Sequence, residues 1–370
     1  MPKIEAIHTD RILVPMRRKW VITGGAGTHD RSPFLLVRLK SEEIEGIGEV
    51  SGTHLWSGEG FETAEAAVRN VLAPALIGLE LSPNVVRIAM DKALAGFPFT
   101  KAGIEMAVWD ALGKHRGASV STLLGGSIRT AVSSKFSISG VSPGQAAAIA
   151  HQAWDAGFRK FKVKVGTGLA GDLERVRAVR KSLGDQVPLG VDANGGWSLS
   201  EARRALAYLE DLQITTIEQP LQKANLHETA VLRAHSNIPI LLDESVWSAK
   251  DVALAARLGA ADAVNIYVGK AGGILGALEA VQVAQAVGIG ATMGSNLELG
   301  IGHAAILQVL SVSTGFDLDS YAPDVAAPLY YVTDLVEPGF TIKNGEVPIP
   351  TGPGLGVSLI EEVLGRFKVG

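Results

Sequence analysis

Three acidic residues in the middle of the sequence, Asp192, Glu218 and Asp243, each follow a short apolar run and precede a loop. They lie roughly 25 residues apart, which is the length of one strand-plus-helix unit. Because neighbouring parallel strands are about 4.8 Å apart, acids at one level of three strands converge on one point. A single strand-end acid commonly caps a helix, but three together repel one another unless a cation binds them. Such oxygen ligands predict one Mg²⁺ or Mn²⁺ ion per chain.

Three lysines accompany these acids. Lys162 and Lys164 share one face of the predicted strand 159–165, because alternate residues of a strand point to the same side. An isolated pair of this kind is typical of side chains that snorkel to water, but one strand before the acids it is predicted to face the barrel mouth. Repulsion between two ammonium groups lowers the pKa of each, which predicts Lys164 as a neutral base and Lys162 as an anion-binding group. Lys270, after strand 262–267, is predicted to stand across the mouth as the second acid/base group.

A divalent ion flanked by lysines suits the removal of a weakly acidic proton. A carbon beside a carboxylate holds its proton firmly, because ionisation places a second negative charge on the carboxylate oxygens. A divalent cation and a charged lysine stabilise that enolate electrostatically. The residues therefore predict an enzyme that removes and returns a proton next to the carboxylate of a small-molecule substrate.

The elements that must position these residues are short strands alternating with Ala-rich helices after Gly125 and Gly126. Such alternation predicts a parallel sheet, either closed into a (β/α) barrel or open and doubly wound. The barrel is favoured because no glycine-rich dinucleotide loop follows any predicted strand. Eight strands are predicted, near residues 132–138, 159–165, 188–192, 215–218, 239–242, 262–267, 289–293 and 315–318.

The first part of the sequence predicts a different unit. Alternating apolar runs from Lys3 to about Val50 indicate antiparallel strands, and helix-period spacing indicates helices over 62–76, 85–94 and 101–115. The predicted domains are an α+β capping unit over 1–128, the barrel over 129–330 and a C-terminal segment over 331–370 that folds back onto the capping unit.

Composition argues against several function classes. Lys and Arg total 34 against 38 Asp and Glu, and no basic run could follow a phosphate backbone, so a nucleic-acid partner is not predicted. The absence of cysteine excludes disulfides and thiolate chemistry and fits a reducing, cytoplasmic location. The first residues lack the apolar stretch of a signal peptide, and no segment has membrane-spanning length without charges, so no membrane association is predicted.

In order and spacing, seven pieces of the sequence resemble the enolase superfamily, in particular the muconate lactonizing enzyme subgroup of its mandelate racemase/muconate lactonizing enzyme family. They are Ile104–Gly126, Lys162-Val163-Lys164, Asp192-Ala193-Asn194, Glu218-Gln219-Pro220, Asp243-Glu244-Ser245, Asn265–Gly273 and Asn296-Leu297-Glu298. The resemblance implies an α/β fold: a modified TIM (β/α)7β barrel with an α+β capping domain built from both termini. It also implies metal on the three acids, acid/base roles for Lys164 and Lys270, and a homo-oligomer.

The resemblance further implies supporting residues. Lys162 supports Lys164, Asn194 and Glu244 support the metal ligands, and Glu298 lies near the substrate. Mandelate-racemase-like members of the family use a His on the seventh strand together with an Asp on the sixth, but here the sixth strand carries Lys270. His303 is therefore predicted to lie in the helix after Glu298 and not to be catalytic.

Substrate specificity in the resembling family comes from loops of the capping domain. Here these would be residues 23–29, with His29, and residues 51–60, in which His54 and Trp56 are predicted to line the mouth. The same side chains are equally common in surface loops that bind no substrate.

The predicted eighth strand ends in Asp317 and Asp319, a spacing that resembles the acid pair with which dipeptide epimerases hold an ammonium group. Two inward acids would repel a dicarboxylate, although either could cap a turn instead. The first interpretation is a muconate-type cycloisomerase. The alternatives are a dipeptide or N-acyl amino acid epimerase/racemase, an acid-sugar dehydratase, and a non-catalytic structural relative.

Overall fold

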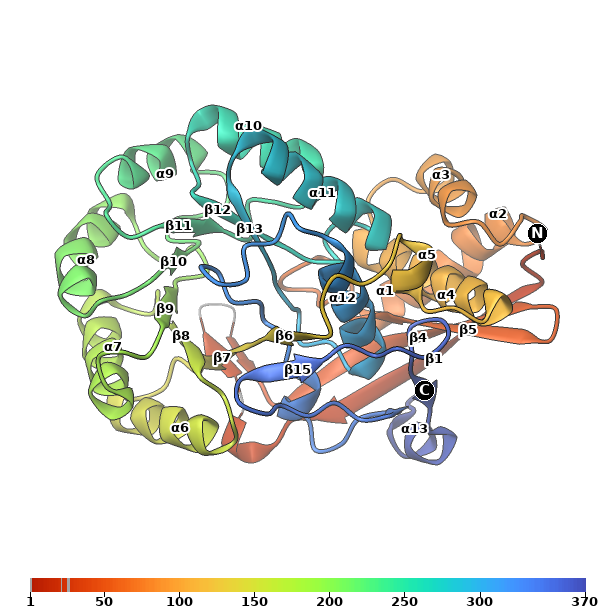
Figure 1. The fold of residues 1–370 in the computed structure, drawn as a ribbon, viewed down its shortest axis with the longest axis horizontal. Helices are drawn as coiled ribbons and strands as arrows, with labels where there is room; N and C mark the ends of the chain where they lie inside the picture. The colour runs from red at the N-terminus through yellow and green to blue at the C-terminus, as the bar shows by residue number, and fades with distance from the viewer. Residues whose placement is uncertain (1, 21, 25–26) are drawn as a thin grey trace.

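The computed structural model describes the backbone of residues 2–20, 22–24 and 27–370, and the side chains of residues 2–18, 20 and 30–370. Its central sheet has seven parallel strands in the order β13-β12-β11-β10-β9-β8-β7, so neighbours in sequence are neighbours in space. Helices α6 to α11 form an arc outside this curled sheet (Figure 1). The strands are β7 (Lys135–Ile138), β8 (Lys160–Lys164), β9 (Leu189–Asp192), β10 (Ile217–Glu218), β11 (Ile240–Leu242), β12 (Ala263–Ile266) and β13 (Gly290–Met293).

The helices alternate with these strands, as the predicted βα pattern requires. Several begin with a capping residue: Ser198 Oγ, for example, accepts a hydrogen bond from Glu201 N at the start of α8. The helices are α6 (Pro143–Asp155), α7 (Leu169–Leu183), α8 (Leu199–Asp211), α9 (Leu226–Arg233), α10 (Ala249–Leu258), α11 (Ile274–Val287) and α12 (Gly300–Val312).

The prediction of an eighth strand near 315–318 is wrong, because this segment turns. Asp317 N still donates to a carbonyl of β13, but the chain then reverses: Ser320 N donates to Asp317 Oδ1 and Tyr321 N to Asp317 O, both at 3.0 Å. Asp317 therefore caps a turn, which is the second of the two roles considered for it and one that aspartate side chains commonly take.

The gap between β13 and β7 is instead crossed by an irregular segment. Asp324 N donates to Met293 O of β13 at 2.8 Å, and Lys135 N of β7 donates to Pro323 O at 3.0 Å. Proline has no N–H to contribute to a strand ladder. Single hydrogen bonds around Pro323 thus take the place of a paired eighth strand.

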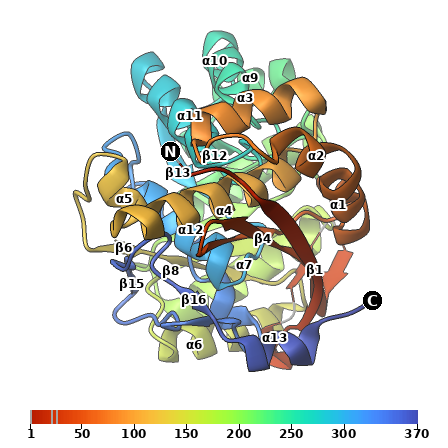
Figure 2. The ribbon, with the colours of Figure 1, turned by 90° about the vertical axis from the view of Figure 1, so that its right-hand side faces the viewer.

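The predicted antiparallel strands near the N-terminus are confirmed as a three-stranded sheet of order β1-β4-β5, which stands beside the barrel (Figure 2). A short hairpin, β2 with β3, precedes β4. Part of the predicted specificity loop 23–29, and all of its side chains including His29, lie outside the described residues. The bounds are β1 (Ala6–Pro15), β2 (Ile22–Gly24), β3 (Gly27–His29), β4 (Arg31–Ser41) and β5 (Ile44–Val50).

The predicted helices of the capping unit are present, with the first divided by a π-helical turn over Val68–Leu72. The helix predicted over 101–115 begins earlier, with Pro98 in its first turn, and ends before Gly117, whose φ of 62° favours glycine. The bounds are α1 (Phe61–Ala67), α2 (Ala73–Leu76), α3 (Pro83–Ala93), α4 (Pro98–Arg116) and α5 (Val120–Leu123).

Helix α4 lies against the capping sheet with its backbone almost in contact. It is buried from Phe99 to Gly113, and a Cβ atom added to Gly48 of β5 would stand 1.8 Å from Gly103 O. No L-residue with a side chain fits there without moving the helix. This close contact fixes α4, whose other side carries Glu105 toward the barrel.

Glu105 of α4 caps a barrel helix from the capping unit. Its carboxylate accepts hydrogen bonds from Leu275 N at 3.1 Å and Ile274 N at 2.5 Å, the first backbone donors of α11. Burial raises the pKa of Glu105 to about 7. The loop that carries Lys270 ends at this helix start, so the capping unit helps to position that lysine.

Glu49 of β5 caps a second barrel helix, and its protonation is predicted to make stability depend on pH. It accepts hydrogen bonds from Leu299 N at 2.8 Å and Gly302 N at 3.0 Å, yet burial raises its pKa from 4.5 to about 8. Between these values the folded state binds a proton that the unfolded chain has released. The contribution of Glu49 to the free energy of unfolding is therefore fully present below pH 4.5 and is lost as the pH rises toward about 8.

We expect the Tm of the protein to fall between about pH 5 and pH 8, and Glu49→Gln to reduce that fall. Thermal unfolding at both pH values, for the wild type and the variant, measures the difference. Glu43→Gln, at an exposed position of the turn between β4 and β5, is the control. An equal fall in the wild type and in Glu49→Gln would show that Glu49 does not hold the proton.

The C-terminal segment returns to the capping sheet. Its strand β15 (Glu346–Pro348) pairs with β6 (Ala131–Ser133), β14 (Val336–Glu337) pairs with β16 (Ser358–Leu359), and α13 (Glu361–Phe367) packs on β1. The domain boundaries at 128 and 330 stay a prediction. Within the described residues, no helix combines the length and apolarity needed to cross a membrane.

Candidate active site

The structure brings Asp192, Glu218 and Asp243 to the carboxyl ends of three neighbouring strands. Asp192 ends β9, Glu218 ends β10 and Asp243 follows β11, with Asp192 and Glu218 paired in register. All three are buried, with at most 2% exposure. The carboxyl ends of barrel strands are where catalytic residues of such folds lie.

Lys162 and Lys164 of β8 both point toward this acid triad. Lys162 Nζ lies 3.0 Å from Glu218 Oε1 and 3.2 Å from Asp192 Oδ2. Lys164 Nζ lies 2.7 Å from Asp192 Oδ2 and 2.9 Å from Asn194 Oδ1. The two lysines therefore bind the same side of the triad, as their two-residue spacing predicts.

Lys270 approaches the triad from the opposite side. Its Nζ lies 2.5 Å from Asp243 Oδ1 and donates to Asp243 O and Asn265 O, both at 2.8 Å. It also stands 4.1 Å from the centre of the Tyr267 ring. Because Lys164 binds the first acid and Lys270 the third, the strand that bears Glu218 runs between the two amines.

The charge balance at Lys162 differs from the prediction. Burial lowers the pKa of Lys162, but the Glu218 and Asp192 carboxylates outweigh burial and raise the pKa well above its ordinary value. Burial alone would raise the pKa of Asp192, but the Lys164 and Lys162 ammonium groups hold it well below its usual range. Attraction to the acids, rather than repulsion between the lysines, therefore decides the protonation of Lys162.

Asn194 and Glu244 connect to the triad through Lys164. Asn194 Nδ2 donates to Glu244 Oε1 at 2.9 Å, while Asn194 Oδ1 accepts from Lys164. Burial, together with the charges of Asp243 and Asp192, raises the pKa of Glu244 to about 8. Asn194 is thereby held between the Glu244 carboxyl group and the Lys164 amine, which fixes its orientation.

The donor set around the triad fits a hard divalent cation. Carboxylate oxygens are the ligands that Mg²⁺ and Mn²⁺ prefer, and Asn265 Oδ1 and Glu244 Oε2 are buried there with no hydrogen-bond partner within the described part of the chain. Across the described residues, no three acid or imidazole side chains are yet close enough to enclose an ion. The lysines occupy the carboxylate oxygens, so ion binding requires these side chains to rearrange.

A cavity of about 720 Å³ lies between the 51–60 loop and the loops after β10 and β11, and it borders this site at Glu244. Trp56 stacks on Trp247 and Tyr267, with ring centres 5.3 and 5.5 Å apart. His54 also lines the cavity, but it is exposed and lies 3.4 Å from Glu62. Of the two residues predicted to line the mouth, Trp56 packs against other aromatic rings and His54 is exposed.

Three other predicted residues lie outside the triad's contacts. Glu298 is buried in the loop before α12, where it accepts from Ser295 and from Asn296 N, and Ser51 of the capping unit donates to it at 3.4 Å. Asp317 and Asp319 are exposed, and Asp319 lines a cavity at the other end of the barrel. The structure thus does not bring this Asp pair to the mouth.

His303 is fully buried in α12, as predicted for a helix residue, against Phe340 at a ring distance of 4.5 Å. Burial lowers its pKa to about 3, so the ring is neutral. It makes no contact with the acid triad.

Sequence reasoning missed four residues of the site. Asp324 Oδ2 lies 3.3 Å from Lys162 Nζ, Tyr267 donates to Asp243 Oδ2 at 2.8 Å, and Trp247 stacks over the mouth. Lys135, the first residue of β7, is buried inside the barrel. The available signal was its place in the predicted strand 132–138, in which alternate residues face the barrel interior.

Comparison with known proteins agrees with the fold. Residues 7–125 match the family described as mandelate racemase/muconate lactonizing enzyme, N-terminal domain, and residues 145–363 match enolase C-terminal domain-like proteins. Muconate cycloisomerase 1 of Pseudomonas putida is 34% identical over 92% of both chains. N-succinyl-L-Arg/Lys racemase of Bacillus cereus is 31% identical over 99% of this chain and 98% of the relative.

The fold of a muconate lactonizing enzyme from Pseudomonas fluorescens, solved with muconolactone, superimposes with a TM-score of 0.95, at 32% identity and with complete coverage of both chains. The curled parallel sheet with its antiparallel cap is therefore an enolase fold. The chain belongs to the enolase superfamily, in the mandelate racemase/muconate lactonizing enzyme family. Within that family it is an isomerase of the muconate lactonizing enzyme subgroup, of the cycloisomerase or racemase/epimerase kind.

Proposed function

We propose that the chain exchanges a proton at the carbon beside a substrate carboxylate, with Lys164 and Lys270 as the acid/base pair and Asp192, Glu218 and Asp243 as ligands of one Mg²⁺ or Mn²⁺ ion. The observation that carries this proposal is the placement of the two amines on opposite sides of the acid triad. When bound, the ion supplies positive charge against the enolate that forms as the proton leaves.

The chain's own residues divide the work. Lys162, whose pKa is raised, stays charged and stabilises negative charge developing on the substrate carboxylate. Lys164 is oriented by Asn194, and Lys270 by Asp243 and the Asn265 carbonyl. In a racemisation one lysine removes the proton and the other returns it to the opposite face. In a cycloisomerisation one lysine delivers the proton after the lactone forms.

Charge balance favours a dianionic substrate. The ion pairs around the triad join as many lysines as carboxylates, so their charges cancel when every lysine carries its proton, as it does in a cycloisomerase whose lysine delivers a proton. A divalent ion then adds two positive charges, which a dianion balances in a site of low dielectric constant. The members are Lys135, Lys162, Lys164 and Lys270 with Asp192, Glu218, Asp243 and Asp324.

The first candidate reaction is therefore the cycloisomerisation of a muconate-type dicarboxylate. The acid pair that would oppose such a substrate, Asp317 and Asp319, is exposed away from the mouth. A second candidate is racemisation of N-succinylated amino acids, because these can also carry two carboxylates and a relative named for such a reaction is similar over the whole chain.

The test is an assay in deuterium oxide with Mg²⁺ against cis,cis-muconate, N-succinyl amino acids and free dipeptides. We expect metal-dependent incorporation of deuterium beside the carboxylate, with dianionic compounds preferred over zwitterionic dipeptides. Protein treated with a chelator is the control. A preference for dipeptides would contradict the charge argument, and the absence of exchange with every class would contradict the proton-transfer proposal itself.

A further inference from the structure

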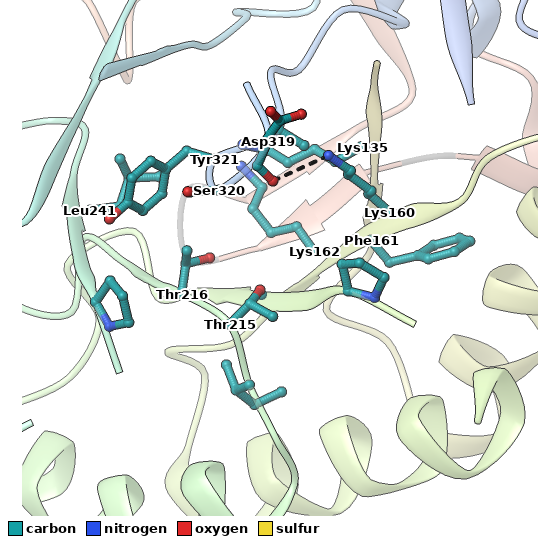
Figure 3. A pocket seen from close by; sticks show the side chains of 15 residues that line it. Lys135, Lys160, Phe161, Lys162, Thr215, Thr216, Leu241, Asp319, Ser320 and Tyr321 are labelled. Carbon is teal, nitrogen blue, oxygen red and sulfur yellow. Dashed lines mark hydrogen bonds between the residues drawn. The ribbon is translucent and has the colours of Figure 1, made fainter. Parts of the chain in front are cut away.

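A second cavity, of about 450 Å³, lies at the amino ends of the barrel strands, on the opposite side of the acid triad from the mouth. Its walls are residues at or just before the starts of β7 to β11, and the segment 319–322 that follows the Asp317 turn. Figure 3 shows Thr215 and Thr216 below the Lys162 side chain, with Tyr321 and Leu241 to one side and Lys160 and Phe161 to the other.

This cavity exists because small or polar residues take the place of bulky apolar side chains at some inward positions of the lower barrel. Layers of Val, Ile and Leu normally fill the inside of such barrels. Here Gly190 of β9 and Thr216, just before β10, line the cavity, and a Cβ atom on Gly190 would stand 2.5 Å from Thr216 Oγ1. The small side chains at these two positions therefore leave the cavity open, and hydroxyl groups line part of it.

Lys135 contributes a buried amine that the catalytic site does not satisfy. Its side chain is 9% exposed, and its Nζ makes no hydrogen bond within the described part of the chain. Its ion pair there is with Glu218 Oε2 at 3.8 Å, beyond hydrogen-bond distance. Lys135 Nζ is not among the fully buried, unpartnered nitrogens of the described residues, so it is open to the cavity and can donate hydrogen bonds to an acceptor from outside the chain.

Lys160 places a second amine at the rim of the same cavity. Its Nζ donates to Leu318 O at 3.2 Å and, more weakly, to Asp319 O at 3.4 Å, both uncharged acceptors. The Asp319 carboxylate also borders the cavity, but it is exposed, so water and salt screen its charge more than they screen the buried charge of Lys135. The amine groups that line the cavity, from Lys135, Lys160 and Lys162, therefore outnumber its one carboxylate, that of Asp319.

The remaining wall is apolar. Pro188, Ile214, Pro239 and Leu241 line it, so a ligand that fills the cavity needs a hydrocarbon body beside its anionic group. We propose that this cavity is a binding site for a small organic carboxylate with an apolar body, held by Lys135 and Lys160. It is separate from the mouth and does not rest on the reaction proposed there.

The test uses 4-bromobenzoate as the probe, with the neutral 4-bromobenzamide as its matched control. Anomalous scattering from crystals of the full chain grown with the probe locates the bromine. Calorimetric titration gives affinities for the wild type and for Lys160→Met, which removes the rim amine and touches no residue of the acid triad. Lys181→Met, at an exposed position of α7, is the control variant.

We expect bromine density inside the cavity, and at least roughly tenfold weaker binding both for the amide and for Lys160→Met, because a hydrogen bond to a charged group is lost. Lys181→Met should bind like the wild type. Titrations repeated in a Lys164→Met background exclude binding at the mouth. Bromine found only at the mouth, no bromine site, or equal affinity for acid and amide would each overturn the proposal.

Lys135→Met is the second variant, because the two amines are expected to act together. It should weaken binding at least as strongly as Lys160→Met, since its amine is the more buried of the two. Circular dichroism confirms folding before titration. If Lys135→Met does not fold, Lys160→Met and the amide comparison still decide the result.

Discussion

Lys164→Met and Lys270→Met should each lower turnover by at least roughly 10³-fold, because each removes one of the two acid/base groups while keeping a side chain of similar length. If the reaction is a racemisation, the variants should differ in a specific way. Each should still exchange the proton of one enantiomer with solvent deuterium, through the lysine that remains, without forming the other enantiomer. Proton NMR of each enantiomer in deuterium oxide separates exchange from inversion.

Lys250→Met, at an exposed position of α10, is the matched control and should leave turnover unchanged. The double variant should lose exchange with both enantiomers. Exchange that survives in the double variant would show that another group removes the proton, and the lysine mechanism would then be wrong.

Asp243→Asn is expected to weaken Mn²⁺ binding by more than roughly 100-fold and to remove metal-dependent activity. The amide replaces a charged ligand and also leaves Lys270, now 2.5 Å from Asp243 Oδ1, without its carboxylate partner. Binding of a metal ion to the folded state raises the Tm. Added Mn²⁺ should therefore raise the Tm of the wild type and leave that of Asp243→Asn nearly unchanged.

Asp185→Asn, an exposed substitution after α7, is the control for the metal experiment and should respond to Mn²⁺ like the wild type. Calorimetric titration with Mn²⁺ gives the affinity directly. Wild-type affinity in Asp243→Asn would remove Asp243 from the proposed ligand set.

The acid triad could be predicted because strand ends and chain spacing depend on local pattern. Asp192 and Glu218 each end an apolar run, and one strand-plus-helix unit separates them, so a parallel sheet places them side by side. The shared face of Lys162 and Lys164 follows from the two-residue period of a strand. These features need no knowledge of how distant segments pack.

Other parts of the site depend on distant packing. Phe316-Asp317-Leu318-Asp319 alternates like a strand, but the turn at Asp317 and the missing donor of Pro323 prevent pairing. Asp324 reaches Lys162 only because that irregular segment crosses from β13 to β7. The raised pKa of Lys162 likewise requires carboxylates from two other strands, which a local repulsion argument cannot include.

The two capping-unit acids that reach across to barrel helices limit how this enzyme can be recombined with its relatives. Glu49 and Glu105 complete the first turns of α12 and α11, so each helix depends on a residue encoded far upstream. A chimera that joins this barrel to a foreign capping domain would leave those backbone donors unsatisfied unless the donor sequence supplies acids at both places. Exchanging only the specificity loops between family members therefore preserves these two helix caps, whereas exchanging the whole capping domain removes them.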